Sequence, residues 1–189
     1  MSPSAEWSDI EVYRRSQAGN ESAFAALYRR FQGPVFRFAL RMSGSESVAE
    51  EVTQEVFLFL LREPGRYRPE AGALGAFLIG VARNHLRRHL ERRRRTVGLE
   101  EDVPAGDAGG PGVEFERRNE VEVVRRAISA LPAGYREVVV LCELGETSYE
   151  EAAAALGCPI GTVRSRLNRA RALLRARLAR ARERARCLA

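Results

Sequence analysis

Arginine is the side chain whose number and spacing in this sequence point most directly to a chemical role. Seven arginines and one acid occupy Arg83–Arg95, and ten arginines and one acid occupy Arg164–Arg186. A guanidinium donates paired hydrogen bonds to phosphate and to guanine, whereas a merely solvated helix face usually mixes both signs of charge. The two stretches therefore predict two separate contacts with a polyanion. The lack of lysine in the chain is explained more simply by codon bias in a GC-rich genome.

Other kinds of chemistry find little support in the sequence. His85 and His89 stand four residues apart, as a metal-binding pair on one helix would, but no third ligand is near them in the chain. Cys142, Cys158 and Cys187 have neither a zinc spacing nor a CxxC motif, so reduced thiols are expected. No nucleophile elbow, phosphate-binding loop or zinc-protease motif is present. We expect a protein that is not an enzyme and needs neither a cofactor nor a metal.

The composition fits a protein of one or two small domains that works in the cytoplasm. The chain has 189 residues, of which 45% are hydrophobic and 30% charged, enough apolar material for one medium domain or two small ones. No apolar run approaches the roughly 20 residues of a membrane helix. Residues 1–30 contain four acids and no apolar signal-peptide core. We therefore expect a cytoplasmic protein without membrane insertion.

A change of composition in the middle of the chain divides it in two. Residues 96–112 read TVGLEEDVPAGDAGGPG, which is acidic, rich in glycine and proline, and without apolar periodicity. Such a segment is typical of a flexible linker. We predict an all-α fold in which this linker joins two small helical domains, residues 1–95 and residues 113–189.

Capping motifs and apolar residues at helical spacing outline the N-terminal domain. Ser8 with Glu11, and Ser47 with Glu50, have the spacing of capping boxes that open two helices. Between them, Gly-Pro at residues 33–34 is expected to break or bend a helix. The last helix of this domain should span about residues 73–95, and its inward side chains are predicted to be Leu74, Phe77, Leu78, Val81, Leu86 and Leu90.

The most specific pattern in the C-terminal domain is SYEEAAAALGCPIGTVRSRLNRAR, which starts at Ser148. Ser148 with Glu151 opens a short alanine-rich helix, and Gly157 can adopt the left-handed conformation that ends it. Val163 and Leu167 then anchor a second helix. This arrangement predicts a helix-turn-helix that reads the major groove of DNA, with a basic helix that pairs with a protein as the alternative. The side chains expected to point toward DNA are Arg164, Ser165, Asn168 and Arg169.

Two blocks of this sequence resemble regions of one protein family. The sequence is similar to region 4 of the sigma-70 family, in its extracytoplasmic-function (ECF) group, in the block LPAGYREVVVLCELGETSYEEAAAALGCPIGTVRSRLNRARALL. It is similar to region 2 of that group in AEEVTQEVFLFLLR, followed by GALGAFLIGVARNHLRRHL. The likeness covers most of residues 9–95 and 114–180, in the order of the family. It implies a factor that takes bacterial RNA polymerase to promoters.

The resemblance implies roles for particular residues. Region 2 of such factors binds the clamp helices of the largest polymerase subunit, and the matching side chains here are Glu51, Gln54 and Glu55. A polar, acidic helix face suits an arginine-rich partner helix, although a merely solvated face would look the same. Region 4 is implied to bind the polymerase flap through the segment around residues 135–144. It is also implied to read the −35 element as duplex, through Arg164, Ser165, Asn168 and Arg169.

Region 2 is further implied to open the duplex at the −10 element and capture an unpaired base. Asn84 matches the position of the family that reads this base. Its amide can pair with a Watson–Crick edge. Tyr67 lies in the loop that matches the wall of the pocket, whereas Phe77 stands where the family usually has tryptophan and is at least as readily a core residue. The arginines expected to neutralise nearby phosphates are Arg83, Arg87, Arg88 and the run at residues 92–95.

The partners implied by the resemblance are core RNA polymerase, promoter DNA and an anti-sigma factor. The competing interpretation is a dimeric helix-turn-helix repressor or activator that binds a palindrome without polymerase. That interpretation explains the helix-turn-helix equally well, but it leaves the acidic face of residues 48–61 and the basic stretch at residues 83–95 unused. The sequence therefore favours the sigma factor.

Overall fold

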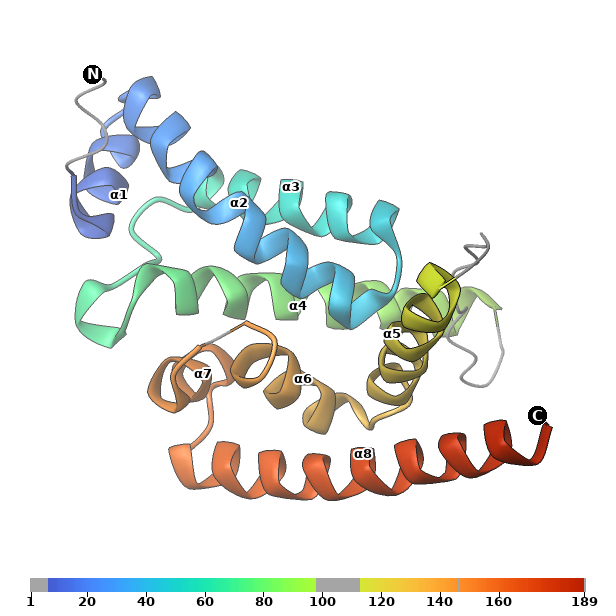
Figure 1. Ribbon diagram of the computed structural model, residues 1–189. Helices are drawn as coiled ribbons and strands as arrows, with labels where there is room; N and C mark the ends of the chain where they lie inside the picture. Colours follow the sequence, from blue (N-terminus) through green and yellow to red (C-terminus); the bar gives the residue numbers. More distant parts are fainter. Residues whose placement is uncertain (1–6, 98–112, 146, 189) are drawn as a thin grey trace.

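The structure, a computed structural model, describes residues 7–97, 113–145 and 147–188. Its helices are α1 (Asp9–Gln17), α2 (Glu21–Ser43), α3 (Glu46–Arg62), the 3-10 turn η2 (Pro69–Ala71), α4 (Leu74–Val97), α5 (Val113–Ser129), α6 (Ala133–Cys142), α7 (Tyr149–Leu156) and α8 (Ile160–Leu188). These described residues contain no strand, and the predicted all-α fold is confirmed. In Figure 1, α4 crosses the middle of the molecule, with α1 to α3 on one side and α5 to α8 on the other.

The N-terminal group of helices, α1 to α4, packs around an apolar core. α2 lies against α1, α3 and α4, and α3 also contacts α4. Leu27, Leu60, Leu74 and Leu78 come from three of these helices and are almost completely buried. Each fully buried leucine stabilises the fold by roughly 1.5–3 kcal/mol, so these contacts hold α3 and α4 in a fixed relation to α2.

α2 continues as one helix through the Gly-Pro pair at residues 33–34, where the sequence predicted a break or a bend. Proline lacks a backbone donor and usually interrupts a helix interior. Here the apolar face runs on across the proline, with Phe31, Val35 and Phe38 all buried in the same core. Packing on that core therefore outweighs the hydrogen bond that is lost at Pro34.

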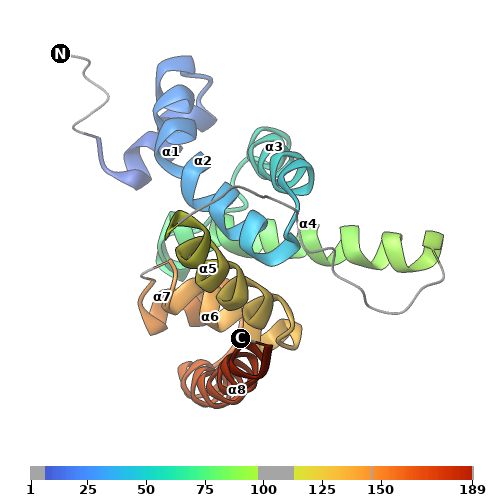
Figure 2. The ribbon, with the colours of Figure 1, turned by 45° about the vertical axis from the view of Figure 1, so that its right-hand side comes forward.

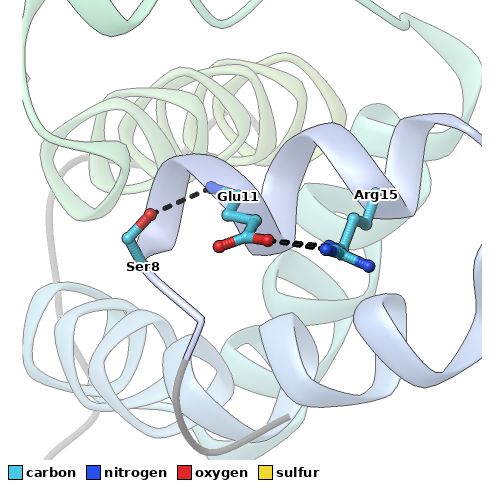
Figure 3. A network of polar contacts seen from close by, with 3 residues as sticks. All are labelled: Ser8, Glu11 and Arg15. Atoms are coloured by element: carbon cyan, nitrogen blue, oxygen red, sulfur yellow. Dashed lines mark hydrogen bonds and ion pairs between the residues drawn. The ribbon is translucent and has the colours of Figure 1, made fainter. Parts of the chain in front are cut away.

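Serine side chains cap the first and third helices. The Ser8 Oγ accepts a hydrogen bond from the Glu11 N–H, as predicted, while the Glu11 carboxylate binds the Arg15 guanidinium on the next turn (Figure 3). The predicted capping box at Ser47 is wrong, because the N-cap of α3 is Ser45. Only two residues separate α2 from α3, so α3 has to begin as soon as α2 ends.

The C-terminal group, α5 to α8, has a core of its own around α8. α8 contacts α5, α6 and α7, and Leu131, Val138, Val163 and Leu167 are buried among them. α7 lies between the predicted cap Ser148 and Gly157, as expected, and α8 continues as one helix to Leu188. Among the described residues, no helix is long and apolar enough to cross a membrane.

The two groups of helices are in contact with each other. α4 packs against α7, and α2 packs against α6. Figure 2, which turns the molecule by 45°, shows the C-terminal end of α4 extending away from both groups. α4 ends at Val97, so its last two residues fall inside the predicted linker, and residues 98–112 of that linker lie outside the described residues.

The corrected helix start gives a direct test of the fold. Replacing Ser45 with alanine should lower the free energy of unfolding by about 1 kcal/mol, because the backbone donor that it caps loses its partner. Ser47→Ala, at an exposed position inside the first turn of α3, should change it by less than about 0.5 kcal/mol. Urea unfolding followed by circular dichroism measures both variants. The reverse ranking would restore Ser47 as the cap.

Candidate nucleic-acid and polymerase interfaces

The turn between α7 and α8 is fixed by hydrogen bonds and by one glycine. The Ser148 Oγ accepts from the Glu151 N–H at 3.2 Å, and the Glu151 carboxylate accepts from the Ser148 N–H at 3.1 Å. The predicted capping box is therefore confirmed. Gly157 ends α7 at a φ of 61°, in the left-handed region that glycine adopts without strain. The Thr162 N–H then donates to the Pro159 carbonyl at 2.8 Å, which starts α8 in a defined direction.

α8 buries one stripe of its first turns and exposes the opposite one. Val163, Leu167 and Ala170 are each at most 2% exposed. Further along α8, the Arg171 guanidinium binds the carboxylate of Glu143, which follows the end of α6. This contact holds α8 beside α6. The exposed stripe contains all four predicted −35 contacts, namely Arg164, Ser165, Asn168 and Arg169.

The predicted −10 residues of α4 lie in two different environments. Asn84, Arg87 and Arg88 are exposed. Arg83 instead turns toward the C-terminal group, where its Nε lies 2.6 Å from a Glu137 carboxylate oxygen. Its Nη1 also donates to the Leu156 carbonyl at 3.2 Å. DNA could reach the first three side chains directly, whereas the guanidinium of Arg83 is occupied by protein groups.

Tyr67 lies in the core rather than on the surface of its loop. Its side chain is 5% exposed, and the ring packs edge-on against Tyr13 and beside Phe77, at centroid distances of 5.0 and 5.4 Å. The hydroxyl donates to the Gly72 carbonyl at 2.9 Å. Burial, with a smaller contribution from nearby carboxylates, raises the pKa of Tyr67. The ring therefore fixes the loop before α4 and would have to leave the core to stack on a base, so its contact with DNA stays a prediction.

A charged groove runs between α3 and α4 on the outer side of the N-terminal group. Glu51 and Gln54 are exposed and Glu55 is half-buried, so the predicted clamp-binding residues share an accessible face of α3. The His89 Nδ1 lies 3.7 Å from a Glu51 carboxylate oxygen across the groove. The groove is lined by Glu51, Glu55, His85, Arg88, His89 and Arg92.

The histidines of this groove have a specific electrostatic setting. Burial lowers the pKa of His85, and the neighbouring Arg88 and Arg92 lower it further against the opposing effect of Glu55 and Glu51. The part of the chain that the structure describes contains no group of three histidine, cysteine or acidic side chains that could hold a metal ion.

Glu137 is a site residue that the sequence analysis did not single out. It is 5% exposed, although it carries a formal charge, and its partner Arg83 lies 54 residues away in the chain. For the segment around residues 135–144, the sequence predicts only a contact with the polymerase flap. One signal in the sequence could have identified Glu137: it stands four residues before Leu141 and so lies on the apolar face of α6. Acids at such positions are rarely fully buried unless they are paired.

Comparison with known proteins gives the same two regions as the fold. The chain matches the family descriptions "Sigma-70 region 2" over residues 27–96 and "Sigma-70, region 4" over residues 122–174. It is 35% identical to the ECF RNA polymerase sigma factor SigE of Mycolicibacterium smegmatis, over 95% of this chain and 71% of that protein. It is 33% identical to the ECF RNA polymerase sigma-E factor of Escherichia coli K12, over 89% of this chain and 93% of that protein.

Two solved structures have a similar fold. CnrH in complex with the cytosolic domain of CnrY has a TM-score of 0.69 and 27% identity, covering 90% of this chain and 96% of that one. RpoE in complex with the anti-sigma factor NepR from Bartonella quintana has a TM-score of 0.66 and 26% identity, covering 82% and 96%. Both sigma regions therefore occur in this chain, in order, on the helices described above. The chain belongs to the sigma-70 family of RNA polymerase sigma factors, in its extracytoplasmic-function group.

Proposed function

We propose that this chain binds core RNA polymerase through its region 2 and directs initiation at promoters whose two elements it reads with separate helices. As an ECF sigma factor it is a regulator of transcription rather than an enzyme, and it acts on promoter DNA together with core polymerase. The observation that carries the proposal is the presence of both sigma regions in one chain, with a polar stripe of α8 exposed opposite its buried anchors.

The proposed division of labour follows the two groups of helices. Residues 1–95 form the region 2 domain, residues 113–189 form the region 4 domain, and residues 96–112 join them. The ends of the two family matches, at residue 96 and from residue 122, support these boundaries. Separate domains allow two modest DNA affinities to combine, because each bound domain raises the effective concentration of the other at the DNA.

The roles of individual residues follow from exposure and chemistry. Arg164 and Arg169 can donate bidentate hydrogen bonds to guanine, and Asn168 can pair with adenine in the major groove of the −35 element. Asn84, exposed on α4, has the amide needed to hold an unpaired base at the −10 element. Arg87 and Arg88 would neutralise adjacent phosphates.

The alternative, a dimeric helix-turn-helix repressor that acts without polymerase, is not supported. Such a protein has no use for a region 2, whereas this chain matches region 2 over residues 27–96. The acidic and polar face of α3, which borders the charged groove between α3 and α4, also has no role in that alternative. We therefore assign Glu51, Gln54 and Glu55 to the clamp of core polymerase, and the segment around residues 135–144 to its flap.

An anti-sigma factor is the remaining proposed partner. The structurally similar sigma factor RpoE was solved in complex with the anti-sigma factor NepR, and the structurally similar CnrH in complex with the cytosolic domain of CnrY. We expect an inhibitor of this chain to cover its polymerase-binding surface, because occlusion of one docking site is enough to prevent holoenzyme formation.

Transcription in vitro tests the proposed function directly. Core polymerase with this chain should initiate at a small set of sites in fragmented genomic DNA, and sequencing of the transcript starts should reveal two shared elements upstream. Core polymerase alone provides the background. Starts that are no more selective than this background would refute the proposed function.

Two asparagine variants should separate the two DNA-reading roles. In holoenzyme, Asn168→Ala should weaken binding of the −35 duplex by about tenfold and leave binding of a single-stranded −10 oligonucleotide unchanged. Asn84→Ala should do the reverse, because it removes only the amide that pairs with the unpaired base. Fluorescence anisotropy with the elements found by transcript sequencing measures both. Equal losses on both probes would contradict the separation of roles.

A charge reversal on α3 should weaken the polymerase contact. Glu55→Arg is expected to lower the affinity for core polymerase by about tenfold or more, because it sets like charges against an arginine-rich partner helix. Glu63→Arg makes the same change of charge at the end of the same helix, away from the groove, and should have little effect. Binding of labelled protein to core polymerase is the measurement. If both variants bind like wild type, the groove is not the docking surface.

A further inference from the structure

The contact between the two groups of helices is centred on one buried ion pair. Arg83 of α4 lies 2.6 Å from Glu137 of α6, with the two side chains 21% and 6% exposed. The second arm of the guanidinium donates to the Leu156 carbonyl at the end of α7, at 3.2 Å. One side chain of the N-terminal group therefore binds two helices of the C-terminal group.

Two more arginines bridge the groups at a neighbouring place. The Arg41 Nη1 donates to the Leu144 carbonyl at 2.6 Å, and the Arg136 Nη1 donates to the Met42 carbonyl at 3.0 Å. Beside the ion pair, the helices approach so closely that a Cβ added to Gly80 would lie 3.2 Å from the Ala155 carbonyl oxygen. The docked arrangement is thus specified by geometry as well as by charge.

This arrangement conflicts with the reading of a promoter. Arg83 is one of the arginines that should neutralise phosphates beside the −10 element, yet its Nε and Nη1 are bound to Glu137 and to the Leu156 carbonyl. A phosphate that approached Arg83 in the docked form would also meet the negative charge of Glu137. Moreover, α4 and α7 touch, whereas two DNA elements even one helical turn apart have centres about 34 Å from each other.

We infer that Arg83 exchanges partners: Glu137 holds it while the two groups are docked, and a phosphate of the −10 region takes it when they separate. Glu137 thereby restrains DNA binding by the protein that has not yet met core polymerase. The exchange of Glu137 for phosphate rests on the proposed function, whereas the docking by the ion pair does not.

A buried ion pair suits this exchange because its net contribution is small. The loss of hydration on burial largely cancels the attraction between the charges, so separation into water costs little overall. Removing one partner has a different effect, since it leaves the other charge buried without compensation. A variant at Glu137 therefore destabilises the docked form selectively and shifts the population toward the open form.

Glu137→Gln, which keeps the shape of the side chain and removes its charge, is the test. In small-angle X-ray scattering the full chain should show a larger radius of gyration than wild type. Its affinity for a fluorescent duplex of mixed sequence should rise by about tenfold, because Arg83 becomes available. Glu143→Gln is the matched control, since it makes the same change of charge and frees Arg171 at an exposed pair within the C-terminal group.

A second variant opens the interface without touching the ion pair. Gly80→Leu places a side chain where even a single carbon would crowd the Ala155 carbonyl, and leucine favours the helical conformation of α4 more than glycine does. Gly134→Leu is its control, because the nearest atoms there belong to the flexible end of the Arg166 side chain, 3.8 Å away. Circular dichroism verifies the helix content of all four variants, and Gly80→Leu decides the matter if Glu137→Gln does not fold.

Each outcome bears on the inference. Expansion and tighter DNA binding in Glu137→Gln and Gly80→Leu, beyond their controls, support it. Wild-type dimensions in both variants overturn the docking, and expansion without tighter DNA binding overturns the exchange of partners. Promoter-specific transcription with core polymerase should persist in Gly80→Leu, because Gly80 lies outside the residues assigned to DNA and to polymerase. If the wild-type chain gives no such transcription, the proposed function is refuted. The docking is tested independently by the scattering measurement.

Discussion

The burial of α4 on two opposite sides is the constraint on which the rest of this structure depends. Leu74 and Leu78 face the core of the N-terminal group, while Gly80 and Arg83 face α6 and α7. A helix used in this way needs a small residue where a second helix crosses closely, and a charged residue there has to be paired. Asn84, Arg87 and Arg88, which follow on the same helix, stay open to solvent.

Features that depend on neighbouring residues could be predicted from the sequence, and features that depend on packing could not. The capping box of Ser148 and the glycine turn after α7 are local, and both have the predicted form. The cap of α3 was predicted at Ser47 but is Ser45, because the short connection from α2 makes α3 begin at once. Pro34 was expected to interrupt α2, but the apolar face on both sides of it is buried in one core.

The same distinction holds for the functional residues. Val163 and Leu167 mark the buried stripe of α8, so the exposed face opposite them could be deduced from helical periodicity alone. Arg83 could be assigned to a basic stretch but not to its partner Glu137, which is brought near only by the docking of two groups. Leu90 shows the converse error, because its helical register predicted burial, whereas its side chain is 41% exposed.

Docking affects unequally the two helices that are proposed to read DNA. The reading face of α8 stays exposed in the docked form, and the stripe opposite it is buried within its own group, so separation of the groups does not change its geometry. α4 is different, because Arg83 lies in the interface next to Asn84. Under the proposed roles, the −35 element can be bound before the groups separate, whereas full contact with the −10 element requires separation. Only the open form can bind core polymerase, the −35 duplex and the −10 element at the same time. The free energy of binding to core polymerase and to the −35 duplex can therefore drive the separation of α4 from α7.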